Sequence, residues 1–167
     1  MAQKKPDNYA EMHKTPHNSR QNYAEFGAII LSLAKEVRAT DKAGKKTRDV
    51  AYHSAKNGGM VVVHSEAARA YSKYLEERPE ITAYEACKPL DATRLNSVQK
   101  TDIRGEYFKA QWSSDFYICH ADGTAAVREL VNAADLTKRA EVEKLELSRR
   151  YWAALGVNDW MVVITGQ

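Results

Sequence analysis

Apolar and polar positions along the chain follow two different periods, and these periods predict the order of its helices and strands. Apolar residues at helical spacing predict helices over about 19–39, 65–77 and 135–155, the last ended by Gly156. Short apolar or alternating runs predict strands at 60–63, 81–87, 106–112, 114–119, 124–131 and 160–165. The run at 60–63 is expected to be buried, and 106–131 is expected to form a three-strand meander. This order predicts an α/β sandwich, a central mixed β-sheet flanked by helices.

The ends of the chain differ in composition. Residues 1–18 are polar and contain Pro6 and Pro16, which is typical of a flexible N-terminal arm. Residues 19–167 contain no internal repeat, low-complexity tract or linker, so they are expected to form a single domain. The whole chain has 167 residues, of which 44% are hydrophobic, enough for a substantial core.

A net charge of +3 favours an anionic partner only weakly, and a few basic or polar segments make nucleic acid a candidate. The segment 41–48 could follow a phosphate backbone or could be an ordinary solvated loop; its basic residues are Lys42, Lys45, Lys46 and Arg48. Lys109 and Gln111 alternate with apolar residues on the predicted strand 106–112, so they would face either DNA or solvent. Arg128, on the predicted strand 124–131, is a further candidate for DNA contact.

The cysteines and the N-terminus indicate the compartment. Cys87 and Cys119 lack CxxC spacing, and no pair of histidines has metal-ligand spacing, which argues against a zinc site and thioredoxin-type chemistry. Free thiols fit a reducing compartment. No apolar run reaches membrane-spanning length, and the start of the chain lacks the apolar core of a secretory signal. A cytoplasmic protein is therefore expected, with no membrane partner.

Two carboxylates form the strongest chemical signal. Asp115 lies at the start of the predicted strand 114–119, and Glu129 lies on the next strand, across an Ala-Asp-Gly turn. A hairpin would hold both side chains close together. Carboxylate oxygens are hard ligands for a divalent cation, and such cations are a common means of hydrolysing a phosphodiester.

Several motifs resemble the core of the TnsA endonuclease subunit of heteromeric transposases. They are SSDFYI at 113–118, DG at 122–123, VREL at 127–130, EKLELSRRYW at 143–152, GV at 156–157 and WMVVIT at 160–165. The family has a near-identical EKLELERRYW helix, followed by a short turn and a strand that begins with Trp. The resemblance extends over about 61–165 and implies a restriction-endonuclease-like, or PD-(D/E)XK, nuclease core.

The resemblance implies a metal-dependent DNA endonuclease that cuts the 5′ ends of a transposon. Asp115 would match the metal-binding aspartate of the family, Glu129 the Glu or Gln of its third motif, and Glu66 its helix glutamate. These oxygens would hold Mg²⁺ or Mn²⁺. The implied partners are double-stranded DNA, a DDE transposase subunit and an AAA+ ATPase regulator. Without the resemblance, Glu66 would be explained by the favourable helix dipole in the first turn of its helix.

The sequence departs from the family at one position. The third motif of the family reads Glu/Gln-x-Lys, and Val131 stands where the lysine is expected. Arg128 is adjacent but would point to the face opposite Glu129. Lys144 lies beside the apolar face of the last helix and could supply the missing charge, although a snorkelling or salt-bridged lysine is the more ordinary explanation.

Two alternatives to an active TnsA-like endonuclease remain open. Val131 favours a nuclease-fold protein that has lost cleavage and serves in DNA binding or assembly. The length of the chain favours a phage or repair nuclease of the same fold, since TnsA-like proteins commonly carry a further C-terminal domain.

Overall fold

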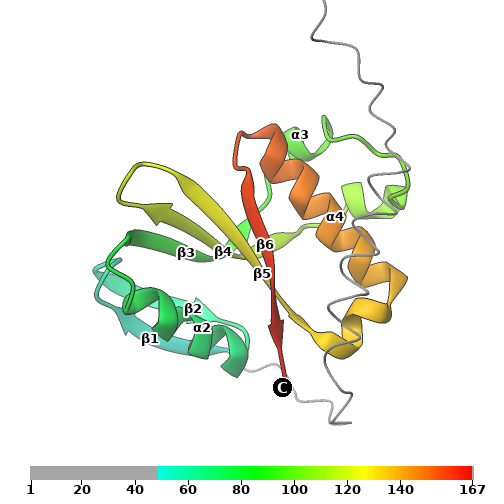
Figure 1. Ribbon diagram of the computed structural model, residues 1–167. Coiled ribbons are helices and arrows are strands. Elements are labelled where there is room, and N and C mark those ends of the chain that lie inside the picture. The colour runs from blue at the N-terminus through cyan, green and yellow to red at the C-terminus, as the bar shows by residue number, and fades with distance from the viewer. Residues whose placement is uncertain (1–48, 167) are drawn as a thin grey trace, which may run out of the picture.

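A four-stranded mixed β-sheet organises the protein, which is described by a computed structural model for residues 49–166 (Figure 1). The strands follow the order β3 (Ile81–Pro89), β4 (Ser113–His120), β5 (Ala125–Asn132) and β6 (Asp159–Thr165). β4 pairs antiparallel with both β3 and β5, whereas β6 runs parallel to β5. The parallel step needs a crossover, and helix α4 (Arg139–Ala154) supplies it. The predicted α/β fold with a mixed sheet is confirmed.

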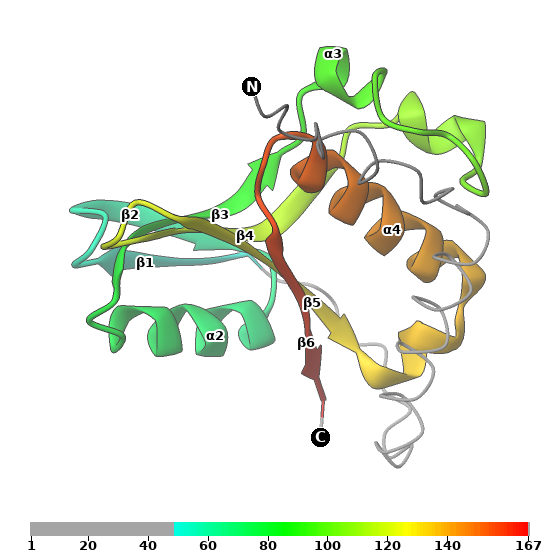
Figure 2. The same ribbon diagram turned by 45° about the horizontal axis from the view of Figure 1, so that its top comes forward.

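A separate hairpin and one helix cover one side of this sheet. The hairpin joins β1 (Val50–Ser54) to β2 (Gly59–Val63), and β2 lies beside β3. Helix α2 (Glu66–Glu76) packs against the hairpin, as Figure 2 shows. Ser65 caps α2 by accepting a hydrogen bond from the amide of Ala68, as the sequence predicts. Together α2 and the strands bury a cluster that includes Leu75, Tyr84 and Phe116.

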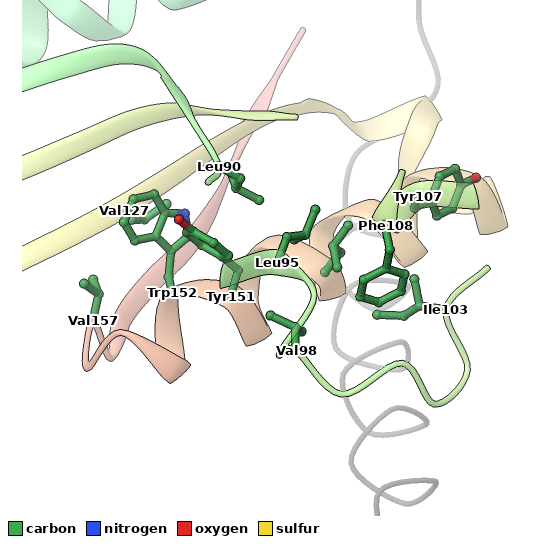
Figure 3. Packing of buried hydrophobic residues seen from close by; sticks show 11 residues of the cluster. Leu90, Leu95, Val98, Ile103, Tyr107, Phe108, Val127, Tyr151, Trp152 and Val157 are labelled. Atoms are coloured by element: carbon green, nitrogen blue, oxygen red, sulfur yellow. The ribbon is translucent and has the colours of Figure 1, made fainter. Parts of the chain in front are cut away.

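The other face of the sheet packs against α4. Because successive side chains of a strand point to opposite faces, Ala126 joins the cluster under α2 while Val127 packs with Leu147, Tyr151 and Trp152 of α4 (Figure 3). Short helices α3 (Ala92–Leu95) and η1 (Gly105–Phe108) complete this second cluster. The sheet is therefore covered on both faces, and α4 lies directly over β4 and β5.

Several expected elements differ from the observed ones. The predicted strand at 106–112 is absent, and the 3₁₀ helix η1 occupies its start instead. This helix buries the consecutive residues Tyr107 and Phe108, whereas a strand would point them to opposite faces of the sheet. The antiparallel strands of the sheet are instead β3, β4 and β5.

β1 was not predicted, and β2 is only half-buried because one face of its hairpin is open: Met60 is 66% exposed. α4 begins at Arg139, since Lys138 is extended and a 3₁₀ helix, η2 (Ala133–Thr137), precedes it.

Other predictions agree with the structure or cannot be compared with it. Gly156 ends α4 with φ +80, as expected for a helix C-terminus. Cys87 and Cys119 are free thiols. Among residues 49–166, no helix is both long and apolar enough to cross a bilayer. The predicted arm at 1–18, the helix at 19–39 and the basic residues Lys42, Lys45, Lys46 and Arg48 lie outside the described residues.

Candidate metal-binding site

Asp115 and Glu129 meet at the point where β4 and β5 separate. Regular pairing of the two strands ends at Phe116 and Arg128. One residue further, the Asp115 amide donates to Glu129 Oε2 at 3.2 Å, and the Leu130 amide donates to Asp115 Oδ2 at 2.7 Å. Side-chain carboxylates thus accept hydrogen bonds from two strand amides here. This reciprocal arrangement holds both acidic side chains next to each other on fixed backbone, as the hairpin predicted.

Burial controls the charge of this pair. The pKa of Glu129 is raised to about 7, mainly by desolvation and also by the negative charge of Asp115, while hydrogen bonds from Ser114, Ser148 and the Asp115 amide oppose the rise. Desolvation also raises the pKa of Asp115; the Leu130 amide opposes that shift, and the charge of Glu141 adds to it. In their ionised form, Asp115 and Glu129 therefore place two negative charges side by side in a poorly solvated position.

Both carboxylates open onto a cavity of about 280 Å³ between the sheet and α4. Its polar lining comes from Asp115 and Glu129 on the sheet and from Glu141, Lys144 and Ser148 on α4; Leu90, Trp112, Leu145 and Leu147 supply apolar walls. Lys144 thus shares the cavity with both predicted ligands. Its Nζ lies 3.5 Å from Glu141 Oε2 and 5.3 Å from the centre of the Trp112 ring.

Glu66 is exposed in the first turn of α2 and does not line this cavity. Desolvation raises the pKa of Asp115, and a positive charge on His64, two residues before Glu66, opposes that rise. His64 itself pairs with Asp49 at 2.7 Å. The role of Glu66 as a third ligand stays a prediction; Glu141, from α4, is the third carboxylate of the cavity.

Val131 lies in an apolar cluster beside the site. It is 4% exposed and packs with Leu136 and Leu145, next to Trp160 and Val162. A strand lysine at this position would begin in that cluster, whereas Lys144 reaches the cavity from the helix. The two positions therefore approach the same region from opposite layers of the fold.

The predicted DNA-contact residues within the described part of the chain are Lys109, Gln111 and Arg128, and none of them lines the cavity. Lys109 and Gln111 are exposed, but on irregular chain after η1 rather than on a strand. Arg128 forms a two-pronged ion pair with Asp159, with nitrogen–oxygen distances of 2.8 and 3.0 Å, and its side chain is only 14% exposed. This intramolecular pairing ties β5 to β6 and accounts for Arg128 without DNA.

Sequence reasoning missed three polar residues of the site: Glu141, Ser114 and Ser148. Glu141 precedes Lys144 by one helical turn, a spacing that could have been noticed. Ser148 occupies the inward side of α4 and is 7% exposed. A buried serine among apolar helix positions was a signal, but its partner on β5 follows only from the packing of α4 on the sheet.

The donor set fits a hard divalent cation of the Mg²⁺ or Mn²⁺ class. Among residues 49–166, no three His, Cys, Asp or Glu side chains form a group close enough to hold an ion unaided. Mg²⁺ is commonly bound by one or two carboxylates, with water and substrate phosphate completing the shell. Asp115 and Glu129 match that pattern, because they are adjacent and because burial, together with the charge of Asp115, raises the pKa of Glu129.

Comparison with known proteins adds no assignment. No protein-family model matches the sequence, and no curated protein matches it.

Proposed function

We propose that this protein is a metal-dependent DNA endonuclease of the restriction-endonuclease-like fold, similar to the TnsA subunit of transposases. The observation that carries the proposal is the shared cavity of Asp115, Glu129 and Lys144, which come from three different elements. Two adjacent carboxylates and a nearby ammonium are the groups needed to hold a cation and a scissile phosphate together.

Each residue would have a distinct part. Asp115 and Glu129 would bind Mg²⁺ or Mn²⁺, which when bound polarises a phosphoryl oxygen and lowers the pKa of a water molecule. Lys144 would place its positive charge against the phosphate, in place of the lysine absent at Val131. The apolar walls from Leu90 and Leu147 would limit water around these charges and so strengthen them.

The arrangement of elements supports this proposal. One long helix, α2, precedes the three antiparallel strands, and a second long helix, α4, then crosses to a fourth, parallel strand. Asp115 and Glu129 occupy the second and third of these strands, and the EKLELSRRYW segment lies in the second helix. This order agrees with the layout that the resemblance implies, a mixed sheet with a helix on each face.

Nicking of supercoiled plasmid tests the activity. Wild type with Mg²⁺ or Mn²⁺ should convert supercoiled DNA to the open-circular form, and EDTA should stop the conversion. Asp115→Asn should abolish nicking. Asp122→Asn is the matched control, because Asp122 lies in the turn of the same hairpin and caps Thr124 at the surface. Absence of metal-dependent nicking, alone and with a partner transposase, would count against the endonuclease.

A second candidate is a nuclease-fold protein that binds or assembles on DNA without cutting it. The packing of Val131 against Leu136 and Leu145 favours this candidate, since an apolar cluster stands at the start of the expected lysine side chain. It predicts that wild type retards DNA in a gel while nicking none. Nicking that requires Lys144 would rule it out.

A further inference from the structure

The serine on the inward side of α4 is unusual in its surroundings. Its neighbours Leu145, Leu147, Tyr151 and Trp152 are all buried and pack against the sheet. Alanine would fill the same position with a better helix propensity and without burying a hydroxyl. Ser148 is therefore expected to contribute through its hydroxyl, which donates to Glu129, a carboxylate of the candidate metal site.

Five side chains, Glu129 among them, form one hydrogen-bonded network that branches at Ser148. The Ser148 hydroxyl donates to Glu129 Oε1. Trp160 Nε1 donates to Ser148 Oγ at 3.0 Å, and Ser114 Oγ lies 3.1 Å from Ser148 Oγ. Trp152 Nε1 in turn donates to Ser114 Oγ at 2.8 Å. The network joins α4 to strands β4, β5 and β6.

The direction of these bonds follows from the chemistry of the indole ring. An indole N–H can donate but cannot accept, so Trp152 and Trp160 each occupy a lone pair of a serine oxygen. The hydroxyl protons must then point away from the rings. Ser148 donates its single proton to the Glu129 carboxylate, so in the contact between the two serines the Ser114 hydroxyl donates and Ser148 Oγ accepts.

We propose that Ser148 is a positioning residue for cation binding: its hydroxyl holds the Glu129 carboxylate in the orientation that accepts a divalent ion. The inference deepens the proposed function and rests on it. Glu129 Oε2 is already held by the Asp115 amide at 3.2 Å, so the Ser148 bond to Oε1 fixes the rotation of the whole group. Groups that orient a ligand in this way commonly change metal affinity by about 10–100-fold when removed.

Calorimetric titration of Mn²⁺ into the EDTA-stripped full chain tests this role. Ser148→Ala should weaken the Mn²⁺ dissociation constant by about 10-fold or more. Ser72→Ala is the matched control, because Ser72 is also a buried helix serine but donates to the Arg69 carbonyl of α2 and does not line the cavity. Loss of thermal stability without loss of affinity is expected for Ser72→Ala.

A double-mutant cycle separates positioning from a general structural effect. If Ser148 acts through Glu129, then Ser148→Ala should cause no further loss of Mn²⁺ affinity in a Glu129→Gln background. If Ser148→Ala does not fold, Ser148→Cys replaces it, since a thiol keeps the volume but is a weak donor. Ser148→Cys should also bind Mn²⁺ more weakly than wild type.

The outcomes distinguish the two proposals. Absence of Mn²⁺ binding by wild type would overturn both the metal site and the role of Ser148. Wild-type affinity in a folded Ser148→Ala or Ser148→Cys variant would overturn the role of Ser148 alone. An equal loss of affinity from Ser148→Ala with and without Glu129→Gln would also overturn it, because the serine would then act independently of the carboxylate.

Discussion

Asp115 and Glu129 each combine a backbone role with a candidate ligand role. Each carboxylate accepts a hydrogen bond from the opposite strand, where the regular pairing of β4 and β5 has ended. Buried strand amides need an acceptor, and these two side chains supply it. Substitution by alanine would therefore remove a backbone contact as well as a charge, so isosteric Asn and Gln variants separate the two effects better.

Glu129 should make the stability of the metal-free protein depend on pH. Its pKa is about 7 in the fold against an ordinary 4.5, so between these values the folded state binds more protons than the unfolded state. The free energy of unfolding should thus fall as pH rises through this window. The loss from this group is about 3 kcal/mol at pH 8 relative to pH 4, from the size of the shift.

Urea unfolding in EDTA at several pH values measures that loss. The Glu129→Gln variant should lack this component and lose less stability than wild type between pH 5 and pH 8. If wild type and Glu129→Gln had the same pH dependence, ionisation of Glu129 would not destabilise the folded state. Carboxylates whose pKa is lowered, such as Glu143 and Glu76, act in the opposite direction below their ordinary pKa and are common to both proteins.

Lys144 should matter for cleavage and little for stability. Lys144→Met should reduce the nicking rate by about 10²-fold, the usual scale for losing one group that stabilises charge in a transition state. Its half-exposed pair with Glu141 should contribute less than about 1 kcal/mol to folding. Lys138→Met is the control, since Lys138 pairs with Asp135 at the surface three residues away. Equal nicking by Lys144→Met and wild type would refute the role of Lys144.

At the scale of elements, α4 connects the structural core to the site. Its buried acids Glu143 and Glu146 are each held by two arginines, Glu143 by Arg104 and Arg139, and Glu146 by Arg149 and Arg150. These ion pairs satisfy charges that would otherwise be costly to bury. Two residues of the same helix line the cavity: Lys144, between these two acids in the sequence, and Ser148, two residues after Glu146.

The junction of β5 with the start of α4 should not accept a lysine easily. Val131→Lys should lower the free energy of unfolding by about 2–3 kcal/mol, because an ammonium group would enter the cluster of Leu136 and Leu145. Val131→Met has a similar length without the charge and should cost less. Urea denaturation of the two variants measures the difference. A Val131→Lys variant as stable as Val131→Met would mean that the ammonium reaches the neighbouring cavity.

At the scale of the whole molecule, cation binding should stabilise the fold. Asp115 and Glu129 repel each other without a cation, and any ion bound only by the folded state raises its stability by linkage. Saturation to about 100 times the dissociation constant corresponds to about 2.7 kcal/mol, or a rise of roughly 5–11 °C in the melting temperature. We expect this rise with millimolar Mn²⁺ or Mg²⁺, and none in Asp115→Asn. A wild-type melting temperature unaffected by both ions would argue against an intact metal site.

Local patterns were sufficient for much of the fold and part of the site. Ser65 as a helix cap, Gly156 as a helix end and the hairpin carrying Asp115 and Glu129 depend on neighbours in the chain, so sequence alone predicts them. The prediction of a strand at 106–112 was wrong, because the burial of Tyr107 and Phe108 depends on distant residues such as Val98 and Leu147.

The remaining features depended on how α4 packs against the sheet. Only that packing brings Lys144, Glu141 and Ser148 to the carboxylates of β4 and β5, and none of these contacts has a local signature. The same packing buries Val131 in an apolar cluster and leaves Glu66 exposed outside the cavity. Periodicity states which side of an element is apolar, whereas the position of each side chain opposite another element is decided by the tertiary fold.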